Sequence, residues 1–524
     1  MANATAAGTK IVLTASATEM SEFGNSQFLA FVGAFAAGPV PKWLLRKLLY
    51  PPVTRNPNGT AKLAPYGLRK VEAILLQNGF SESDVAVVHP ADLHKFIGPE
   101  TKAVGISSMD PTGMGYVSKT YSTLVGGGEP MNATEFKALV GHPSICRFKP
   151  KVIVGGFGSW QLERKRLTRD YGVDCLVVGP GQETILEVFR KAVAGEALPQ
   201  KIRTPAGAEC EDSPVIRHAA MHGAVEISKG CGRNCQFCTP TVQRKVDVPL
   251  EKIVREVAVT ANEFKDEGTN ITLVTEDLFL YGAKGKSFVP EEETVVKLVE
   301  SVAGFPGVKS IQASHMSLAP VVCKPKMVKR LAEILVEHSW YNFNGKPIVT
   351  AETGIETGSV RLMRKYMAGK MLPYKPEKWR EIVTEAFGIL NDCDWYPLAT
   401  LIVGLPDETE DDVAETLGLM DDLHDFNAFY VPLFFVPLED CLLMHKRGTE
   451  LDSLTKMRWE FLTRCWEYNV RIWRNTFLRD RIPSALLGVV NKGAIPVAAK
   501  IAQTYYNITR DEKIGNIIWK LSQA

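Results

Sequence analysis

Three cysteines lie close together in the segment EISKGCGRNCQFCTP, at residues 226–240. Cys231, Cys235 and Cys238 have the spacing C-x₃-C-x₂-C. A structural zinc site needs four protein ligands, usually from two closely spaced pairs of cysteines or histidines. No second pair follows this segment, and no histidine lies close behind it. The three thiolates can instead bind three irons of a 4Fe–4S cluster, which leaves the fourth iron open to an exchangeable ligand.

The other seven of the ten cysteines occur singly in this chain of 524 residues. This distribution does not indicate a disulfide framework. We interpret these cysteines as buried thiols in a reducing cytosol: Cys146, Cys175, Cys210, Cys323, Cys393, Cys441 and Cys465.

A series of alternating strands and helices must position the cysteine segment. It begins at AVEISKG, and five further strands are predicted at residues 271–277, 310–315, 347–354, 397–404 and 428–438. Six strands separated by helical patterns indicate a partial (β/α)6 barrel. Sites in such barrels lie at the carboxyl ends of the strands. The cysteine segment directly follows the first strand, so it lies at the expected end.

The first 200 residues contain a separate β/α series. Short apolar runs predict strands at residues 10–16, 85–90, 103–108, 151–157 and 175–179, and helical patterns lie between or after them. The order indicates an α/β domain with a doubly wound parallel sheet. Ligands of such sheets bind beyond the carboxyl ends of the strands. Those ends are the loops SSMDPTGMG, GGFGSW and GPGQET, whose glycines allow close approach of a ligand to the backbone. No complete G-x-G-x-x-G opens a helix, so a dinucleotide site is weakly supported.

The charge balance excludes some partners. Lys and Arg number 61 against 59 Asp and Glu, a balance that gives no electrostatic footprint for nucleic acid.

The apolar segment Phe28–Val40 is shorter than the about 20 residues of a membrane span, and Glu19 and Glu22 precede it where a signal peptide has positive charge. We therefore predict that this segment is a buried helix and that the protein is cytoplasmic, without a membrane partner.

The composition changes near residue 446, where a basic tail begins. Trp459, Trp466 and Trp473 recur every seven residues and so lie near one helix face. A packed helix that closes the barrel and a partner-binding surface are both open interpretations. The predicted domains are residues 1–205 with the first sheet, a linker at 206–222, the barrel at 223–445 and a helical C-terminal domain at 446–524.

The cysteine spacing, with Phe237 before the last cysteine, resembles the signature of the radical S-adenosylmethionine (SAM) superfamily. The resemblance implies that the amine and carboxylate of SAM chelate the fourth iron. The segment TED, which contains Glu276, lies where the family has a short motif that receives the methionyl amine, so Glu276 is expected to orient SAM. The stretch ETGIETGS, which begins at Glu352, resembles the family's Gly-Ile-Glu-Ser-Gly-Ser, and IVGLPDETEDD resembles its Gly-Leu-Pro-Gly-Glu-Thr. Glu352 is a further candidate for cofactor binding.

The first domain resembles the cobalamin-binding domain of the cobalamin-dependent subfamily. VIVGGFGSW and DCLVVGPGQET are similar to its Gly-Gly-x-His and Gly-Glu-Gly-Glu loops, although Phe157, Gly158 and Pro180 depart from them. DLHKFIG, with His94, fails the D-x-H-x-x-G motif in spacing and in place, so the cobalt is expected to have no His below it. The candidate cobalamin-binding residues are Ser107, Ser108, Gly113, Tyr116, Gly155, Gly156, Gly158, Gly179, Gly181 and Glu183.

Together these resemblances imply a cobalamin-dependent radical SAM methyltransferase with three cofactors: a 4Fe–4S cluster, cobalamin and SAM. A reduced cluster cleaves SAM to a 5′-deoxyadenosyl radical, which takes a hydrogen atom from an unactivated saturated carbon. The carbon radical then takes the methyl group of methylcobalamin, and a second SAM remethylates cobalt(I). The reaction requires an electron donor, which the sequence does not identify.

The overall layout is similar to that of methylases of methanogenic archaea that modify methyl-coenzyme M reductase, one of which methylates a glutamine carbon. This resemblance implies a post-translational modification, with a protein or peptide as the substrate. Two alternatives stay open: a cobalamin-dependent radical enzyme that methylates or rearranges a small molecule, and a non-catalytic iron–sulfur or zinc protein.

Overall fold

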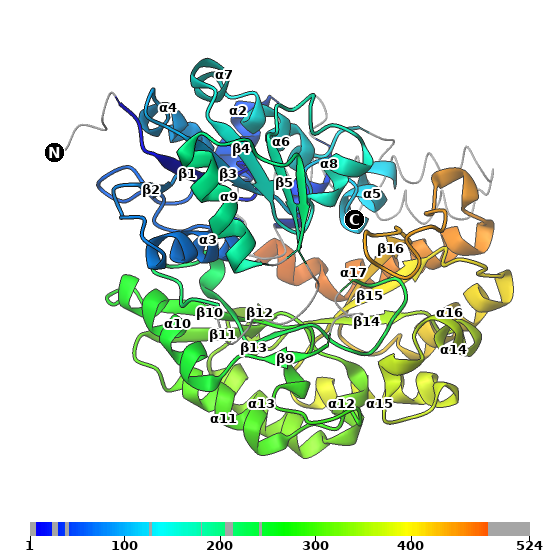
Figure 1. Ribbon diagram of the computed structural model, residues 1–524. Helices are drawn as coiled ribbons and strands as arrows, with labels where there is room; N and C mark the ends of the chain where they lie inside the picture. The colour runs from blue at the N-terminus through cyan, green and yellow to red at the C-terminus, as the bar shows by residue number, and fades with distance from the viewer. Residues whose placement is uncertain are drawn as a thin grey trace. The chain divides into compact units, whose positions relative to one another are not determined.

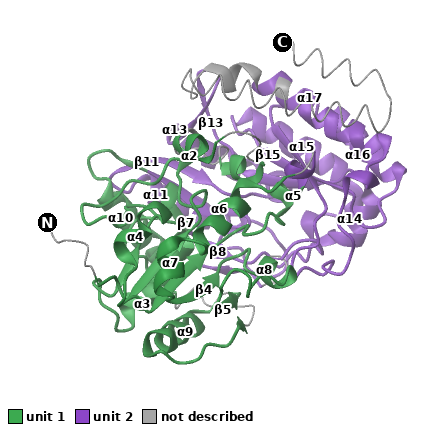
Figure 2. Ribbon diagram, turned by 90° about the horizontal axis from the view of Figure 1, so that it is seen from above, with its two compact units in different colours: residues 1–119, 128–225, 248–269 green, residues 120–127, 226–247, 270–524 purple. Residues whose placement is uncertain are grey.

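The computed structural model describes residues 7–23, 30–36, 41–124, 128–179, 181–204, 213–239 and 244–479. The chain forms two compact units (Figure 2). The first contains residues 1–119, 128–225 and 248–269, and the second contains residues 120–127, 226–247 and 270–524. None of the helices in the described ranges is long and apolar enough to cross a membrane.

The first unit contains a six-stranded sheet in the order β2-β1-β3-β4-β5-β6, and every neighbouring pair in it is parallel. The five predicted strands are confirmed. The sixth, β6, is absent from the sequence-based prediction because it is short and carries charged residues at both ends. The strands are β1 (Ile11–Ala15), β2 (Val85–Val87), β3 (Ala103–Ser107), β4 (Lys151–Gly155), β5 (Cys175–Val178) and β6 (Lys201–Arg203).

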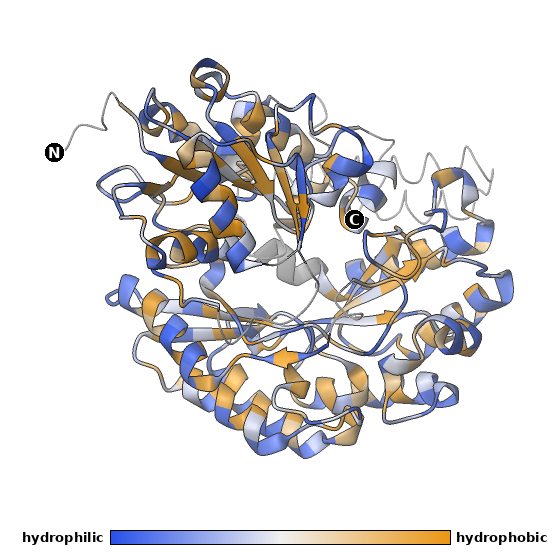
Figure 3. Ribbon diagram, viewed as in Figure 1, coloured by the Kyte–Doolittle hydropathy of each residue, from blue (hydrophilic) through white to orange (hydrophobic). Residues whose placement is uncertain are grey.

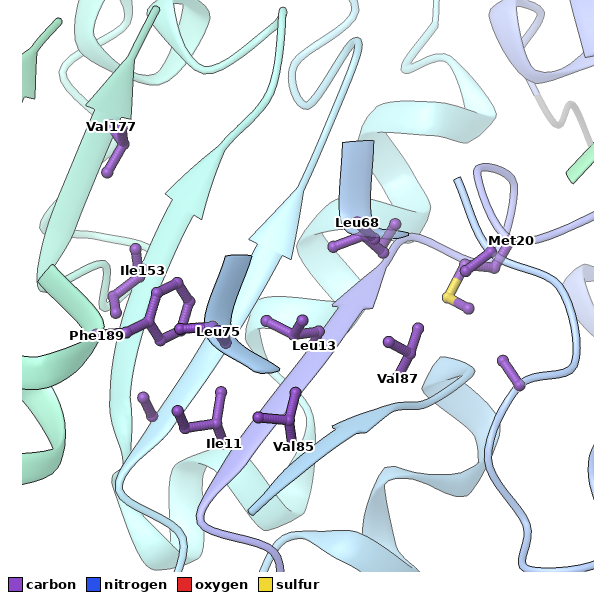
Figure 4. Close-up of a cluster of buried hydrophobic side chains, with 14 of the residues drawn as sticks. Ile11, Leu13, Met20, Leu68, Leu75, Val85, Val87, Ile153, Val177 and Phe189 are labelled. Atoms are coloured by element: carbon purple, nitrogen blue, oxygen red, sulfur yellow. The ribbon is translucent and has the colours of Figure 1, made fainter. Parts of the chain in front are cut away.

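Both faces of this sheet are covered, because successive side chains of a strand point to opposite faces. Ile11 and Leu13 pack on one face, with Leu75 of α3 (Tyr66–Gln77) and Phe189 of α9 (Gln182–Ala194) (Figure 4). Val12 packs on the other face with side chains of α4 (Leu93–Phe96), α6 (Met131–Val140), α7 (Pro143–Phe148) and α8 (Trp160–Arg164). Strands β1 to β5 are therefore largely apolar, as their colours in Figure 3 show. The doubly wound arrangement is as predicted.

Helices alternate with the strands of the six-stranded sheet along the chain (Figure 1). The described piece of the Phe28–Val40 segment contains only a 3₁₀ helix at Phe31–Ala34, so the predicted buried helix is not found there. Residues 206–212 of the predicted linker lie outside the described ranges. The helices are α2 (Lys42–Leu48), α3 (Tyr66–Gln77), α4 (Leu93–Phe96), α5 (Tyr116–Leu124), α6 (Met131–Val140), α7 (Pro143–Phe148), α8 (Trp160–Arg164), α9 (Gln182–Ala194) and α10 (Leu250–Glu263).

The predicted partial barrel is built from two three-stranded sheets, β11-β10-β7 and β14-β15-β16. A parallel bridge between His315 and Glu352 joins them. β14, β15 and β16 pair in parallel. The six strands are β7 (Ala224–Glu226), β10 (Thr269–Val274), β11 (Val308–Ala313), β14 (Glu352–Glu356), β15 (Leu398–Val403) and β16 (Phe429–Phe434).

Helices separate these strands, and two small antiparallel pairs, β8-β9 and β12-β13, accompany them. The short strands are β8 (Ser228–Lys229), β9 (Val246–Asp247), β12 (Tyr341–Phe343) and β13 (Lys346–Ile348). The helices are α11 (Glu292–Ala303), α12 (Leu318–Cys323), α13 (Pro325–Glu337), α14 (Val360–Tyr366), α15 (Trp379–Asp392), α16 (Glu410–Asp422) and α17 (Lys456–Arg479).

Helix α17 contains the three tryptophans of the basic tail. Trp459 and Trp473 are buried, and the Trp473 indole donates a hydrogen bond to the Ala428 carbonyl at 2.8 Å. Trp466 is half-buried and its ring meets Tyr121 edge-on, with centroids 6.0 Å apart. Trp459 and Trp473 thus pack within the second unit and are not available to a partner.

Candidate functional sites

The cysteine loop follows β8 and has an alternating backbone. Gly230, Gly232 and Asn234 have φ values of 69°, 72° and 59°, whereas Cys231 and Arg233 between them do not have positive φ. Alternation between right-handed and left-handed residues can turn successive backbone N–H groups toward one centre, a feature of many anion and iron–sulfur sites. The two glycines adopt positive φ without steric cost. The local sequence therefore permits the tight loop that carries the three cysteines.

The three cysteine side chains are mostly enclosed: Cys231 and Cys235 are buried and Cys238 is half-buried. Burial raises the pKa of the Cys235 thiol to about 12, although Lys370 and Arg233 act in the opposite direction. Burial also raises the pKa of Cys231. Among the described residues, no three His, Cys, Asp or Glu side chains are arranged to hold a single metal ion. A 4Fe–4S cluster has a separate iron for each thiolate and so does not need all three sulfurs to meet at one point.

Arg233, between the first two cysteines, fixes the loop to the rest of the barrel. Its side chain is buried, and its guanidinium donates to the carbonyls of Gly369 and Lys370 at 3.0 and 2.8 Å. It also donates to the Asp277 carboxylate at 3.3 Å and to the Ser317 hydroxyl at 3.1 Å. Asp277 of the TED segment therefore holds the cysteine loop.

A buried ion pair lies beside the cysteines. The Lys370 ammonium donates to Glu356 Oε1 at 2.9 Å, and the two side chains are only 14% and 8% exposed. Lys370 interacts electrostatically with Cys235 and Cys238. Glu356, rather than Glu352, aligns with the glutamate of the family's Gly-Ile-Glu-Ser-Gly-Ser stretch. The sequence-based choice of Glu352 thus left out the carboxylate that lies beside the cysteines.

Acidic groups gather where the strands of the second unit end. Glu276 follows β10 and makes no hydrogen bond to a described residue, and burial raises its pKa. Glu226, Asp277 and Glu352 add to that rise, whereas His315 opposes it. Thr275, which precedes Glu276 in the TED segment, shares a hydrogen bond with the Ser228 hydroxyl, and its N–H donates to the Ser314 hydroxyl. The Glu276 carboxylate is therefore the group of TED left available for a cationic ligand.

His315, just beyond β11, is the cation of this group. Its Nε2 lies 3.4 Å from the Glu352 carboxylate. Burial lowers its pKa, but Glu352, Glu276 and the Thr275 carbonyl outweigh burial and raise the pKa to about 9. The imidazole is thus protonated at neutral pH. In this structure the Glu352 carboxylate is paired with His315 and not with a residue of the cysteine loop.

The predicted loops of the first unit lie at the carboxyl ends of β3, β4 and β5, which are neighbours in the sheet. The Ser108 N–H donates to the Gly155 carbonyl, and the Gly158 N–H donates to the Ser108 carbonyl. A Cβ at Gly156 or Gly158 would overlap the backbone of the loop after β3. These two glycines are therefore required by loop packing, whereas a Cβ at Gly155 would meet no atom closer than 3.7 Å.

The remaining candidates of this unit occupy the same edge. Gly113 lies in the β3 loop with a φ of 71°, and Tyr116 begins α5 with 39% of its surface exposed. Gly179 follows β5, Gly181 caps α9, and Glu183 lies in its first turn. Ser107 is the last residue of β3. The structure thus gathers at one edge of the sheet the residues that the resemblance implied.

A cavity of 170 Å³ opens between this sheet and helices α3 and α9. Its lining is almost entirely apolar, with glycines at the strand ends. A flat, largely apolar group fits such a lining better than a phosphate or a sugar. The lining residues include Leu13, Gly67, Leu68, Val71, Gly105, Ile153, Gly155, Val177, Gly179, Ile185, Val188 and Phe189.

Glu19, in the loop after β1, holds the β3 loop. Its Oε1 accepts hydrogen bonds from the Ser108 hydroxyl at 3.0 Å, the Met109 N–H at 2.9 Å and the Asp110 N–H at 3.4 Å. Burial raises the pKa of Glu19 to about 7, although the hydrogen bonds that it accepts act in the opposite direction.

His94 is exposed on α4, and Asp92 pairs with Arg55 and Lys95. His94 was expected to be a surface or a core histidine without a role at cobalt, and the structure places it on the surface.

No protein-family model matches the chain. Its sequence is 28% identical over 284 residues to a tRNA-2-methylthio-N(6)-dimethylallyladenosine synthase of an Acidovorax species, covering 53% of this chain and 57% of that protein. It is 26% identical over 226 residues to the ribosomal protein uS12 methylthiotransferase RimO of a Nitratiruptor species, covering 42% and 44%. The chain spans about half the length of the curated relatives it matches.

Two solved structures extend the comparison over both units. One is the radical SAM methyltransferase TsrM of Kitasatospora setae with cobalamin and a [4Fe-4S] cluster bound, at a TM-score of 0.51 and 13% identity over 83% of this chain and 77% of that one. The other is the cobalamin-dependent SAM radical enzyme OxsB with aqua-cobalamin and SAM bound, at a TM-score of 0.53 and 10% identity over 99% and 75%. The chain has the fold of cobalamin-dependent radical SAM enzymes. The predicted fold class is confirmed, and the three predicted cofactors are those bound in these two structures.

Sequence reasoning missed five residues of these sites. The family stretch itself could have identified Glu356, and the position of Arg233 between two cysteines was a weak signal. Nothing in the local sequence distinguishes the others, because their partners are distant in the chain. The five residues are Glu19, Arg233, His315, Glu356 and Lys370.

Proposed function

We propose that the chain is a cobalamin-dependent radical SAM methyltransferase that methylates an unactivated saturated carbon of a protein side chain. The observation that carries the proposal is the cysteine loop: Cys231, Cys235 and Cys238 lie within eight residues, shortly after β7, the first barrel strand. Bound there, a 4Fe–4S cluster would supply the electron that cleaves SAM, and cobalamin in the first unit would supply the methyl group.

The residues of the second unit fit a cluster and SAM. Cys231, Cys235 and Cys238 would bind three irons. The unbonded Glu276 carboxylate would accept the methionyl ammonium, and His315 would keep the Glu276–Glu352 group from carrying two uncompensated negative charges. Arg233 would keep the loop rigid through Asp277. These groups bind and orient, while the cofactors perform the chemistry.

The first unit fits cobalamin. Its 170 Å³ apolar cavity suits the flat benzimidazole tail, with Gly155 open toward it. Met109 and Phe157, at the ends of β3 and β4, are 61% and 45% exposed and offer an apolar surface to a macrocycle.

The substrate proposal is a glutamine side chain of methyl-coenzyme M reductase, presented as an extended peptide. Curated relatives named for a tRNA and a ribosomal protein support a macromolecular substrate. A small-molecule substrate is the second candidate, because one similar structure of TsrM holds tryptophan as its substrate. An electron donor of low potential is required in either case.

The test supplies SAM with a deuterated methyl group, methylcobalamin, a strong reductant and a peptide that spans the glutamine. We expect one labelled methyl group on the glutamine side chain and at least one 5′-deoxyadenosine per product. The matched control is the chain with all three cysteines of the loop changed to alanine, which should form neither product.

Two results would refute parts of the proposal. If 5′-deoxyadenosine forms while the peptide stays unlabelled and a small metabolite gains the label, the protein substrate is wrong. If the anaerobically purified and reconstituted chain binds iron and sulfide but neither binds cobalamin nor cleaves SAM, the non-catalytic iron–sulfur alternative replaces it.

A further inference from the structure

Lys370 lies in a part of the second unit that no motif marks. It belongs to a 3₁₀ helix at Ala368–Met371, and its side chain is only 14% exposed. Its ammonium donates to Glu356 and interacts with Cys235 and Cys238. The backbone of the same segment is bonded to the cysteine loop, because Arg233 donates to the carbonyls of Gly369 and Lys370.

One glycine makes room for this pair, and a second makes room for the cysteine loop beside it. A Cβ at Gly354 of β14 would overlap both the Glu356 carboxylate and the Lys370 ammonium. A Cβ at Gly369 would overlap the Arg233 carbonyl. Any other residue at either position would displace the pair or the cysteine loop, so the backbone itself is adapted to an ammonium at this place.

Arg233 fixes the backbone that carries Lys370. The guanidinium is held in one position, because it donates to the carbonyls of Gly369 and Lys370 and to the Asp277 carboxylate at once. The cysteine loop and the segment around Lys370 are therefore held as one piece. The Lys370 side chain, whose backbone is fixed and whose ammonium is bonded to Glu356, therefore loses little further conformational entropy when it makes a new hydrogen bond.

An ammonium has three donors, and Glu356 takes one of them. Sulfurs of an iron–sulfur cluster accept hydrogen bonds, and such bonds and nearby charge set its reduction potential. Reduction adds one electron, and so one negative charge, to a group already bound by three thiolates. A fixed cation beside that group stabilises the reduced form more than the oxidised form.

We propose that Lys370 is a positioning residue of the cluster site, whose ammonium donates to a sulfur of the cluster and makes its one-electron reduction more favourable. The electron comes from an external low-potential one-electron donor. Glu356 holds the ammonium in place and offsets part of its charge. This inference rests on the proposed function, since it requires the cluster.

The test is a redox titration of the reconstituted full-length chain, followed by electron paramagnetic resonance of the reduced cluster. Lys370→Met should lower the equilibrium constant for reduction at least tenfold, which is about 59 mV for a one-electron couple. Lys370→Arg should retain most of the wild-type value. The matched control is Lys378→Met, which removes an exposed lysine paired with Glu381, and its midpoint potential should equal that of the wild type.

Glu356→Gln separates this role from a merely structural one. Removing the carboxylate while keeping the ammonium should raise the midpoint potential, a sign opposite to that of Lys370→Met. Nonspecific damage to the site would not give opposite signs. If Lys370→Met fails to bind the cluster, the sign of the Glu356→Gln shift decides the question.

Unchanged midpoint potentials in both variants, with full cluster content, would overturn the role of Lys370. In that case a wild-type chain that still binds the cluster and cleaves SAM would leave the proposed function intact. A wild-type chain that binds no cluster would instead refute the proposed function.

Discussion

Glu19→Ala should release the loop after β3, which we assign to cobalamin binding. The change removes the acceptor of two good hydrogen bonds, from the Ser108 hydroxyl and the Met109 N–H, and of a longer one from the Asp110 N–H. Ser108 is buried, so its hydroxyl would lack a partner. Leaving such donors unsatisfied costs roughly 1–3 kcal/mol each, so we expect about 2–4 kcal/mol for the loop.

The assay is hydrogen exchange of the full-length chain, read by mass spectrometry on peptides that span residues 107–115. A loss of about 2–4 kcal/mol corresponds to exchange roughly 30- to 1000-fold faster at fixed pH. The matched control is Glu187→Ala on α9, which removes an exposed carboxylate paired with Lys191. Because exposed pairs contribute about 0–1 kcal/mol, this control should leave the loop unchanged.

The pKa of Glu19 also predicts how the stability of the folded chain changes with pH. Burial raises the pKa of Glu19 from 4.5 to about 7, and Asp110 adds to the rise. Between pH 4.5 and about pH 7, the folded chain binds more protons than the unfolded chain. The contribution of Glu19 to the free energy of unfolding is therefore complete below about pH 4.5 and is lost as the pH rises through about 7. At about 1.36 kcal/mol per pKa unit, the whole change is at most about 3 kcal/mol.

Glu19→Gln cannot titrate and serves as the reference. On going from pH 7.5 to pH 5, the wild type should gain stability relative to Glu19→Gln in urea unfolding. A wild-type advantage that stays constant over this range would refute the assignment of a buried, titrating carboxyl, and unchanged loop exchange in Glu19→Ala would refute its role in holding the loop.

Three further predictions concern the cofactors and the cysteine loop. Cys231→Ala, Cys235→Ala and Cys238→Ala should each abolish the ~400 nm absorption of thiolate-bound iron and all 5′-deoxyadenosine formation, whereas Cys175→Ala or Cys393→Ala should leave the cluster intact. His94→Ala should leave the visible spectrum of bound cobalamin unchanged because His94 is exposed, and a clear spectral shift would contradict the expectation that cobalt has no His ligand. Arg233→Ala should cost about 3–5 kcal/mol by leaving the Asp277 carboxylate buried and unpaired. Its thermal midpoint and its iron content after gel filtration should fall, and adding Asp277→Asn should restore part of the loss; if the single variant keeps both values, Arg233 does not anchor the loop.

The sequence determined the features that depend on local chemistry. Apolar runs such as those at β1 and β15 formed strands because branched side chains suit a sheet buried on both faces. The spacing of Cys231, Cys235 and Cys238 indicated three thiolates, and the alternating glycines of the same loop needed no distant partner to bend the backbone. The spacing of the tryptophans in α17 likewise predicted one helix face.

The tertiary structure alone decided which side chains meet. Arg233 bonds the carbonyl of Lys370, 137 residues away in sequence, and Glu19 holds a loop about 90 residues away. Local patterns cannot encode such pairs, because the partners of a charged group depend on which strand ends are neighbours and on what space the packed backbone leaves. The same holds for the tryptophans: the seven-residue spacing was compatible with a partner surface, and only the burial of Trp459 and Trp473 against the second unit showed that they form its core. The three cysteines could therefore be proposed as ligands from local spacing, whereas the charges around them depended on packing.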